Sequence, residues 1–348
     1  MKTVGYAAHS ATTPLVPYHF ERRNLRKNDV LIEILFSGIC HSDLHTVKGD
    51  WGDQKYPLIP GHEIVGKVLE VGPEVKKYKV GDRVGVGCLV DSCQHCDQCE
   101  KHEEQYCRNG LTATYGSLDL IDKTVTQGGY SKHIVVREEF VVKVPVNLDL
   151  SKAAPILCAG ITTYSPLKKW NIGKGSRVGV IGLGGLGHMG VKLAVAMGAE
   201  VTVISRSKDK VDYAKSLGAK DLLCTKDGEA MVKAANSFDF ILDTVPVKHD
   251  FNTYTPLLDI DGSLVLVGQI GPMEEPLTFP LVFGRRRIAG SLIGGIKETQ
   301  EVLDFCAEHG ILPECEHIKP EQINEAWDKL LKENPAHRYV IDMKNLSV

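Results

Sequence analysis

The sequence predicts a two-domain protein, in which a mostly β domain accompanies an α/β domain built on a parallel sheet. The chain of 348 residues is long enough for two domains of ordinary size. Short β-branched runs separated by Gly and Pro fill the chain up to residue 150, which is typical of a small barrel or sandwich. From residue 175 onward such runs alternate with stretches of helical periodicity, which predicts parallel strands covered by helices on both faces.

The strands of the first region are indicated by alternation and by the turns between them. Apolar side chains alternate with others over 30–36, at the period of a half-buried strand. Gly72-Pro73 ends a second run, and Gly81-Asp82 leads into a third. The strands expected here cover residues 30–36, 64–71, 83–86, 130–136 and 141–144.

The second region begins with a β-branched run over 177–181, and Leu186, Met189, Leu193 and Met197 follow it at helical spacing. Further strands are expected over 201–204, near 222, and over 238–242, 263–267 and 288–293, with helices over 208–217 and 229–235. The closing segment is expected to add helices over 298–309 and 321–332 and a strand over 339–341.

The composition excludes several classes of protein. Hydrophobic residues make up 43% and charged residues 24% of the chain, as in soluble globular proteins. The net charge is −3 and no block of like charge is present, so neither nucleic acid nor an anionic membrane is an expected partner. Apolar runs are far shorter than the roughly 20 residues of a membrane span, and residues 1–5 lack the apolar core of a signal peptide. We therefore expect a cytoplasmic location.

Four of the ten cysteines crowd into one short polar segment with the spacing Cys-x2-Cys-x2-Cys-x7-Cys. These four are Cys93, Cys96, Cys99 and Cys107. Four thiolates on one loop can close a tetrahedral zinc site that has no open position, so its role would be structural. A disulfide pair and an iron–sulfur cluster are the alternatives. The segment lacks the bulk for a core, so removal of the metal should unfold it.

A second metal site is indicated by Cys40, His62 and Cys158. One imidazole and two thiolates suit Zn²⁺, and three protein ligands leave one position open for water or substrate, as in catalytic sites. Taken alone, His62 would be an ordinary buried histidine and Cys158 an inert core thiol.

Two acids lie beside these ligands. Glu63 could touch the metal when substrate is absent, and Asp43 could orient His62 from behind. The alternative for both is a surface or turn carboxylate. The cysteines outside the two sets are expected to be packing residues; they are Cys88, Cys224, Cys306 and Cys315.

A glycine-rich fingerprint joins the first strand of the second region to its helix. The motif is Gly182-Leu183-Gly184-Gly185-Leu186-Gly187, which matches Gly-x-Gly-x-x-Gly. Its glycines allow a tight turn and a close approach to a pyrophosphate at the helix N-terminus, so we expect dinucleotide binding.

The end of the next strand predicts which dinucleotide binds. An acid there would hold the free ribose 2′-hydroxyl of NAD. The chain instead has Ser205-Arg206-Ser207, with Lys210 nearby and no acid before Asp209. Cations and hydroxyls suit a 2′-phosphate, so we predict NADP(H); the alternative is a solvated turn in an NAD enzyme.

Several motifs together resemble a known family. The pattern Gly61-His62-Glu63-x2-Gly66-x5-Gly72 and the segments 88–93, 157–164 and 290–300 are similar to the zinc-containing medium-chain dehydrogenase/reductase family, in particular its cinnamyl-alcohol-dehydrogenase-like branch. The resemblance implies a GroES-like catalytic domain over 1–153 and 294–348 with a structural zinc lobe at about 88–110. It also implies a Rossmann NADP-binding domain over 154–293, and a homodimer formed largely through the nucleotide domains.

The same resemblance assigns roles near the open zinc site. Ser42 and His45 occupy the positions of the family's proton relay, in which a hydroxyl passes the proton and a histidine near solvent supplies it. The resemblance also implies a substrate pocket lined by Trp51, Cys88, Leu292 and Ile293.

The expected function is therefore that of an alcohol dehydrogenase or aldehyde reductase with two zinc ions per subunit, one catalytic and one structural. It would transfer hydride reversibly between NADP(H) and primary alcohols or aldehydes, of cinnamyl, benzyl or similar type. The alternatives are an NAD-dependent zinc polyol or sugar dehydrogenase and a zinc- and nucleotide-binding protein without turnover.

Overall fold

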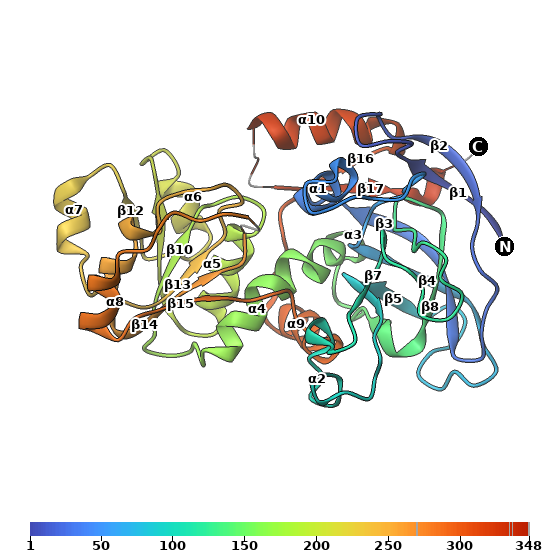
Figure 1. The fold of residues 1–348 in the computed structure, drawn as a ribbon, viewed down its shortest axis with the longest axis horizontal. Helices are drawn as coiled ribbons and strands as arrows, with labels where there is room; N and C mark the ends of the chain where they lie inside the picture. The colour runs from blue at the N-terminus through green and yellow to red at the C-terminus, as the bar shows by residue number, and fades with distance from the viewer. Residues whose placement is uncertain (269–270, 334, 336, 347–348) are drawn as a thin grey trace. The chain divides into compact units, whose positions relative to one another are not determined.

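A computed structural model describes residues 1–268, 271–333, 335 and 337–346 (Figure 1). The chain divides into two compact units, one formed by Met1–Ile161 with Gly294–Val348 and the other by Thr162–Ile293. The first boundary follows Ile161 rather than the expected residue 153. The helix η3 (Ala154–Leu157) extends the first unit past residue 153, because it packs on the strands of that unit, as α3 (Leu150–Ala153) does before it.

The first unit is built on a seven-stranded sheet with the order β16-β17-β3-β4-β5-β9, in which β8 also pairs with β3. The strands are β3 (Asp29–Gly38), β4 (Ile64–Val71), β5 (Arg83–Val86), β8 (His133–Arg137), β9 (Val142–Lys143), β16 (Cys315–Ile318) and β17 (Arg338–Asp342). The neighbours of β3 are all antiparallel to it, and β17 brings the end of the chain next to the first long strand.

The central strand β3 is more buried than its alternating sequence predicts. Eight of its ten residues are buried, whereas the pattern over 30–36 predicted a half-buried strand. The reason is that α3, η3 and η7 (Met343–Asn345) all contact β3 in addition to its neighbouring strands. The carboxyl end of β3 therefore delivers the chain into a buried environment at Cys40.

Smaller elements complete the first unit. Two-stranded sheets pair β1 (Lys2–Ala7) with β2 (Val16–Glu21), and β6 (Leu89–Asp91) with β7 (Thr112–Ala113). The other helices are α1 (His41–Lys48), α2 (Asp97–Glu100), η1 (Glu104–Tyr106), η2 (Glu138–Phe140), α9 (Ile296–His309), η6 (Pro320–Gln322) and α10 (Ile323–Glu333).

The second unit contains a six-stranded parallel sheet with the order β12-β11-β10-β13-β14-β15. The strands are β10 (Arg177–Ile181), β11 (Glu200–Ser205), β12 (Asp221–Cys224), β13 (Phe238–Asp243), β14 (Leu258–Leu266) and β15 (Arg287–Gly290). The helices are α4 (Ala159–Lys169), which starts in the first unit, α5 (Gly187–Ala196), α6 (Val211–Ser216), α7 (Gly228–Lys233), η4 (Phe251–Thr253), η5 (Thr255–Leu257) and α8 (Thr278–Gly284).

This sheet confirms the predicted fold class of a β-rich domain with a parallel α/β domain. The chain order reverses direction across the sheet between β10 and β13, because β11 and β12 lie on one side of β10 and β13 to β15 on the other. Ligands of such sheets bind at the carboxyl ends of the strands near this reversal. No helix in the described part of the chain is long and apolar enough to cross a membrane.

Candidate active site

The buried metal-binding cluster consists of Cys40, His62, Glu63 and Cys158, all in the first unit. One ligand atom from each residue lies within 4.8 Å of the others, and all four residues are buried. Cys40 Sγ and Cys158 Sγ are 3.8 Å apart, and His62 Nε2 is 3.1 Å from Cys158 Sγ. Two thiolates on one tetrahedral zinc, each about 2.3 Å from the ion, lie about 3.8 Å apart.

The ends of secondary-structure elements position these ligands. Cys40 is the N-cap residue of α1, at the point where the chain leaves β3. His62 and Glu63 lie directly before β4, and Cys158 lies between η3 and α4. Because β3 and β4 are paired, their ends bring Cys40 and His62 together.

Asp43 supports this cluster from behind and has no solvent exposure. Its Oδ1 lies 2.9 Å from His62 Nδ1, and its Oδ2 accepts hydrogen bonds from Cys40 N and from the Tyr130 hydroxyl, both at 3.0 Å. A proton on Nδ1 directed at this carboxylate leaves Nε2 as the nitrogen that can bind a metal. Burial is the largest single influence and lowers the pKa of His62, but the Asp43 carboxylate together with the neighbouring Cys88 and Cys40 raises the pKa well above its ordinary value.

Glu63 forms a buried ion pair with Arg338 of β17. Burial raises the pKa of Glu63 to about 7, although the Arg338 guanidinium acts in the opposite direction. The second carboxylate oxygen, Oε2, has no hydrogen-bond partner in the described part of the chain. An unpartnered buried oxygen beside three ligands is available to a cation.

Ser42 and His45 lie one turn apart on α1, and therefore on the same face of that helix. Ser42 Oγ is 3.6 Å from Cys40 Sγ. His45 Nδ1 is 2.8 Å from Asp50 Oδ2, and its ring stacks on Trp51 at 5.3 Å between centroids. Ser42 thus lies beside the cluster, and His45 is partly open to solvent.

The surface lobe gathers its four thiols on one segment. The Sγ atoms of Cys93, Cys96, Cys99 and Cys107 all lie within 4.8 Å of one another. Ser92 Oγ lies 3.2 Å from Cys99 Sγ, and the backbone N–H of Arg108 donates to Cys96 Sγ at 3.4 Å. All ten cysteines are free thiols, so the structure contains no disulfide pair here.

The glycine fingerprint connects β10 to α5 in the second unit, as its spacing predicted. Gly182 has a φ of 85°, which glycine adopts without strain. A Cβ atom at Gly187 would lie only 2.1 Å from the carbonyl oxygen of Gly182, so a side chain is sterically excluded there.

The residues predicted to bind the 2′-phosphate of NADP(H) follow β11. Ser205 ends β11, and its Oγ accepts a hydrogen bond from Ser207 N at 3.4 Å. Lys210 Nζ donates to the carbonyl oxygen of Leu183 in the glycine fingerprint at 3.3 Å. Arg206 is exposed. The structure therefore links the residues after β11 to the glycine loop.

The predicted substrate-pocket residues are divided between the two units. Cys88 belongs to the first unit, where its Sγ lies 3.8 Å from the carbonyl oxygen of Leu157, next to Cys158. Trp51 also belongs to the first unit and is 41% exposed, whereas Leu292 and Ile293 belong to the second. Ile293 has a φ of 36°, directly before the chain returns to the first unit.

Comparison with known proteins identifies the family. Residues 26–146 match the alcohol dehydrogenase GroES-like domain, and residues 185–308 match the zinc-binding dehydrogenase domain. The chain belongs to the zinc-binding alcohol dehydrogenase family. An NADP-dependent alcohol dehydrogenase of Mycolicibacterium smegmatis is 55% identical over 99% of both chains. An aldehyde reductase of Escherichia coli is 50% identical over the full length of both.

Solved structures of this zinc-binding alcohol dehydrogenase family agree. A cinnamyl alcohol dehydrogenase of Sorghum bicolor superimposes with a TM-score of 0.95 at 42% identity, covering 100% of this chain and 99% of that one. A cinnamyl alcohol dehydrogenase of Helicobacter pylori complexed with NADP(H) gives 0.92 at 45% identity, covering 99% of both chains. The predicted family and its cinnamyl-alcohol-dehydrogenase-like branch are thus confirmed.

The donor set of the buried cluster fits the zinc that this alcohol dehydrogenase family binds. Soft thiols and a neutral imidazole nitrogen are zinc ligands, and the spacing of the two thiols is that of a tetrahedral site. The orphaned Oε2 of Glu63 completes the polar lining. In the second unit, a Cβ atom at Gly182 or Gly187 would crowd the turn, so both positions need glycine, as in loops whose backbone contacts a pyrophosphate.

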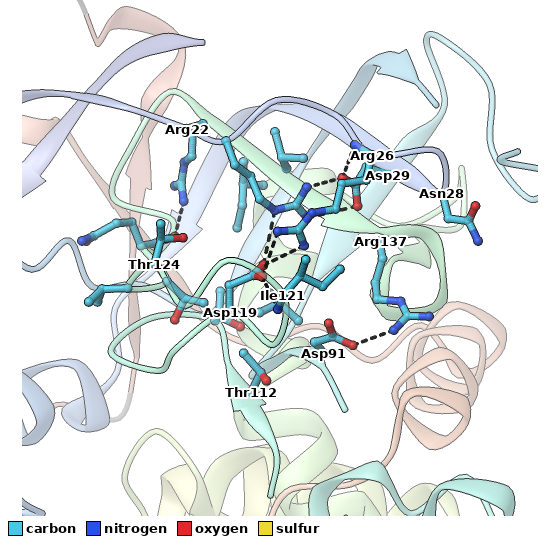
Figure 2. A pocket seen from close by; sticks show the side chains of 18 of the residues that line it. Arg22, Arg26, Asn28, Asp29, Asp91, Thr112, Asp119, Ile121, Thr124 and Arg137 are labelled. Carbon is cyan, nitrogen blue, oxygen red and sulfur yellow. Dashed lines mark hydrogen bonds and ion pairs between the residues drawn. The ribbon is translucent and has the colours of Figure 1, made fainter. Parts of the chain in front are cut away.

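A separate cavity of about 630 Å³ lies in the first unit, away from the metal ligands (Figure 2). The charged side chains in its walls form ion pairs with one another. Arg26 pairs with Asp119 at 2.8 Å, and Arg137 pairs with Asp91 at 2.8 Å. Arg22 donates to backbone carbonyl oxygens, among them that of Gly128 at 2.8 Å. These contacts explain the polar walls as part of the fold of the alcohol dehydrogenase domain.

Sequence reasoning missed the groups that support the site. Tyr130, Arg338 and Asp50 contact Asp43, Glu63 and His45 respectively. Tyr130 is 87 residues from its partner and Arg338 is 275 residues from its own, so no local pattern marks them. Asp50 had a weak signal, because it lies five residues after His45, just beyond the end of the same helix.

Proposed function

We propose that this protein is an NADP(H)-dependent zinc alcohol dehydrogenase that interconverts primary alcohols and aldehydes. The observation that carries the proposal is the buried set of Cys40, His62 and Cys158 beside an unpartnered carboxylate oxygen. The relatives at 50–55% identity are named NADP-dependent alcohol dehydrogenase and aldehyde reductase, which supports the same reaction and cofactor here. Small alcohols and aldehydes are accordingly its substrates.

Cys40, His62 and Cys158 would hold the catalytic zinc, and Asp43 would keep the His62 ring in the metal-binding tautomer. When bound, zinc supplies a Lewis acid for the carbonyl oxygen and NADPH supplies the hydride. The pKa of Cys40 is lowered well below its ordinary value, chiefly by the hydrogen bond with Cys158. A thiolate is therefore favoured at this position.

Ser42 and His45 would move the proton of the reaction. A serine hydroxyl can donate one proton and accept another, so Ser42 suits a relay beside the metal ligands. His45 lies one turn further along α1, where it can exchange a proton with solvent. Asp50 contacts Nδ1 of the ring and Trp51 stacks on its face, so Nε2 is the nitrogen that faces away from Asp50.

We assign NADP(H) binding to the glycine loop with Ser205, Arg206, Ser207 and Lys210, and a second, structural zinc to the four-thiol lobe. The hydroxyls and cations after β11 favour a 2′-phosphate over a free ribose hydroxyl. This arrangement argues against an NAD-dependent polyol dehydrogenase. Two zinc ions per subunit follow from the two separate ligand sets.

The homodimer stays a prediction, and an exposed surface of the second unit supports it. β15 is the outer strand of its sheet in the described chain, so it offers an edge to a second copy. Phe279, Val282 and Phe283 of α8 are 68%, 71% and 76% exposed, and the two Phe rings stack at 4.3 Å. Such an apolar patch marks an interaction site. The cytoplasmic location likewise stays a prediction from the sequence.

The function is tested by following NADPH oxidation with benzaldehyde and cinnamaldehyde. We expect turnover that a chelator abolishes and added Zn²⁺ restores, a kcat/KM for NADPH well above that for NADH, and two zinc ions per subunit by elemental analysis. Absence of turnover with every aldehyde and alcohol would overturn the proposal. A preference for NADH would overturn the cofactor assignment alone.

A further inference from the structure

The loop over residues 244–250 follows β13 and packs against the glycine loop. Thr244 donates both its backbone N–H, at 3.1 Å, and its hydroxyl, at 2.8 Å, to the carbonyl oxygen of Ile181, the last residue of β10. A Cβ atom at Gly182 would lie 3.1 Å from Thr244 Oγ1, and one at Gly187 would lie 3.2 Å from it. Thr244 therefore packs directly against the glycine loop.

His249 closes this loop onto the end of β13. Its Nε2 lies 2.8 Å from Asp243 Oδ2, and its Nδ1 lies 2.8 Å from the carbonyl oxygen of Val247. The other oxygen of Asp243, Oδ1, accepts a hydrogen bond from Val245 N at 3.0 Å. The chain between Asp243 and His249 has no helix or strand, so these side-chain bonds hold its shape.

Both ring nitrogens of His249 face acceptors, and this favours the protonated ring. A carbonyl oxygen and a carboxylate both accept hydrogen bonds, so both contacts are satisfied when the ring is an imidazolium. Burial lowers the pKa of His249, but the hydrogen bonds to Asp243 and Val247 outweigh burial and raise the pKa above its ordinary value. The cation faces an Asp243 carboxylate that is 1% exposed.

The other groups around this ion pair come from residues 250–254 and from the segment after β11. The rings of Phe251 and Tyr254 pack edge-on against His249, with centroids at 4.7 and 5.8 Å. Asp250 is the second acid that acts on His249, and Arg206 after β11 acts electrostatically on Tyr254. The His249 charge is therefore the close counterion of Asp243, with aromatic rings limiting access of water.

We propose that His249 is a positioning residue for the pyrophosphate of NADP(H), which holds the 244–250 loop against the glycine loop and neutralises Asp243 at the end of the sheet where this dianion binds. The inference rests on the proposed NADP(H) site. Loss of the imidazolium proton would leave a buried negative charge near an anionic ligand and would release one end of the loop.

The direction in which the pKa of His249 is shifted determines how NADPH affinity should depend on pH. The folded pKa of His249 is raised, so the ring is fully protonated below its ordinary value of about 6.5 and loses the proton as the pH rises through the raised value. NADPH affinity should fall over the same range. By reciprocity, saturating NADPH should raise the pH at which His249 titrates.

The first test measures the Kd of NADPH by fluorescence between about pH 6 and pH 9. His249→Gln keeps a donor for Asp243 but removes the charge, so we expect a Kd about tenfold higher at low pH and a flat pH profile. The double variant Asp243→Asn/His249→Gln removes both charges and should recover most of the affinity. The kcat at saturating NADPH should change by less than about twofold, because the effect is on binding.

The matched control is His309→Gln, since His309 Nδ1 also lies 3.0 Å from a backbone carbonyl oxygen but belongs to the first unit. Its Kd for NADPH should equal that of the wild type. If His249→Gln bound NADPH as tightly as the wild type at every pH, the inference would be overturned while the proposed function stood. Wild-type protein that did not bind NADPH would overturn both.

A second test needs no variant. In protein labelled with ¹³C-histidine, NMR titration should show His249 protonated at neutral pH and titrating about one unit higher with saturating NADPH than without it. A ring that is neutral at pH 6, or a titration that NADPH leaves unmoved, contradicts the inference even if the variants fail to fold.

Discussion

Two sets of cysteines lie in the first unit, and the chain builds them in opposite ways. The buried cluster takes Cys40, His62 and Cys158 from three separate parts of the chain, at the ends of strands and helices. The surface lobe takes all four thiols from the single segment 93–107. The first therefore comes together only in the folded sheet, whereas the thiols of the second can meet within one short loop.

The ligand charge differs as well. Two thiolates and a neutral imidazole would leave zinc with no net charge, whereas four thiolates would leave it with two negative charges. A neutral centre with an open position can still polarise a carbonyl, but a saturated anionic one cannot.

The supporting groups follow the same division. The buried ligands are held from behind by Asp43, Tyr130 and Arg338, which are themselves buried. The lobe is held mainly by its own backbone and by Ser92. The buried cluster is thus fixed by polar groups from distant parts of the chain, whereas the lobe is fixed mainly within its own segment.

The largest effect expected from this comparison is on turnover, from loss of a buried ligand. His62→Ala should lower kcat/KM for cinnamaldehyde by about 10⁴-fold or more, because the Lewis acid is lost, and should leave one zinc per subunit. Cys306→Ala removes a buried thiol of α9 that belongs to neither ligand set and should keep nearly full kcat. Substantial activity of His62→Ala would mean that the buried cluster is not the reaction centre.

The next effect is on proton movement. Ser42→Ala should keep both zinc ions and lower kcat by about 10²- to 10⁴-fold, as loss of general acid–base help does. Ser42→Thr retains a hydroxyl and should restore most of the rate. The measurement is steady-state kcat with elemental analysis of zinc, and near-normal kcat in Ser42→Ala rules out its relay role.

A smaller effect is expected at the carboxylate behind the buried ligands. Asp43→Asn keeps the shape of the side chain but removes its charge, so zinc affinity should fall by about 10- to 100-fold. Competition with a chelator measures this change. Activity should return largely with excess Zn²⁺; if it does not, Asp43 has a role beyond orienting His62.

The smallest effect on turnover, and a clear effect on stability, is expected in the lobe. Cys96→Ser should lower the Tm by roughly 5 °C and make residues 91–108 sensitive to protease, because loss of metal unfolds the lobe. The folded fraction should keep kcat/KM within about tenfold. A loss of turnover as deep as that of His62→Ala would show that the two sites are not separable in this way.

The sequence predicts those features that are local. The spacing of the four lobe thiols, the glycine fingerprint between β10 and α5, and the alternation of strands with helices all depend on neighbouring residues. The grouping of Cys40, His62 and Cys158 in one site was predicted from their chemistry, because two thiols and an imidazole together are typical zinc ligands.

What sequence could not predict depends on contacts across the chain. Arg338 is 275 residues from Glu63, and Tyr130 is 87 residues from Asp43, so nothing in their own surroundings marks them. The burial of β3 on both faces and the boundary at Ile161 likewise depend on helices that pack from elsewhere. The sequence assigned no role to His249, because its contact with Asp243 and the packing of the following loop on the glycine loop are visible only in the fold.

The position of β17 has a consequence for how the protein is made. This strand lies between β16 and β3, yet it follows every other strand of the first sheet along the chain, so it is synthesised after them. Until then residues 36–38 of β3 have no neighbouring strand on that side, and Glu63 lacks the Arg338 guanidinium beside it. A nascent chain without β17 therefore has an incomplete buried cluster, and its unpaired stretch of β3 is a feature that chaperones and proteases bind.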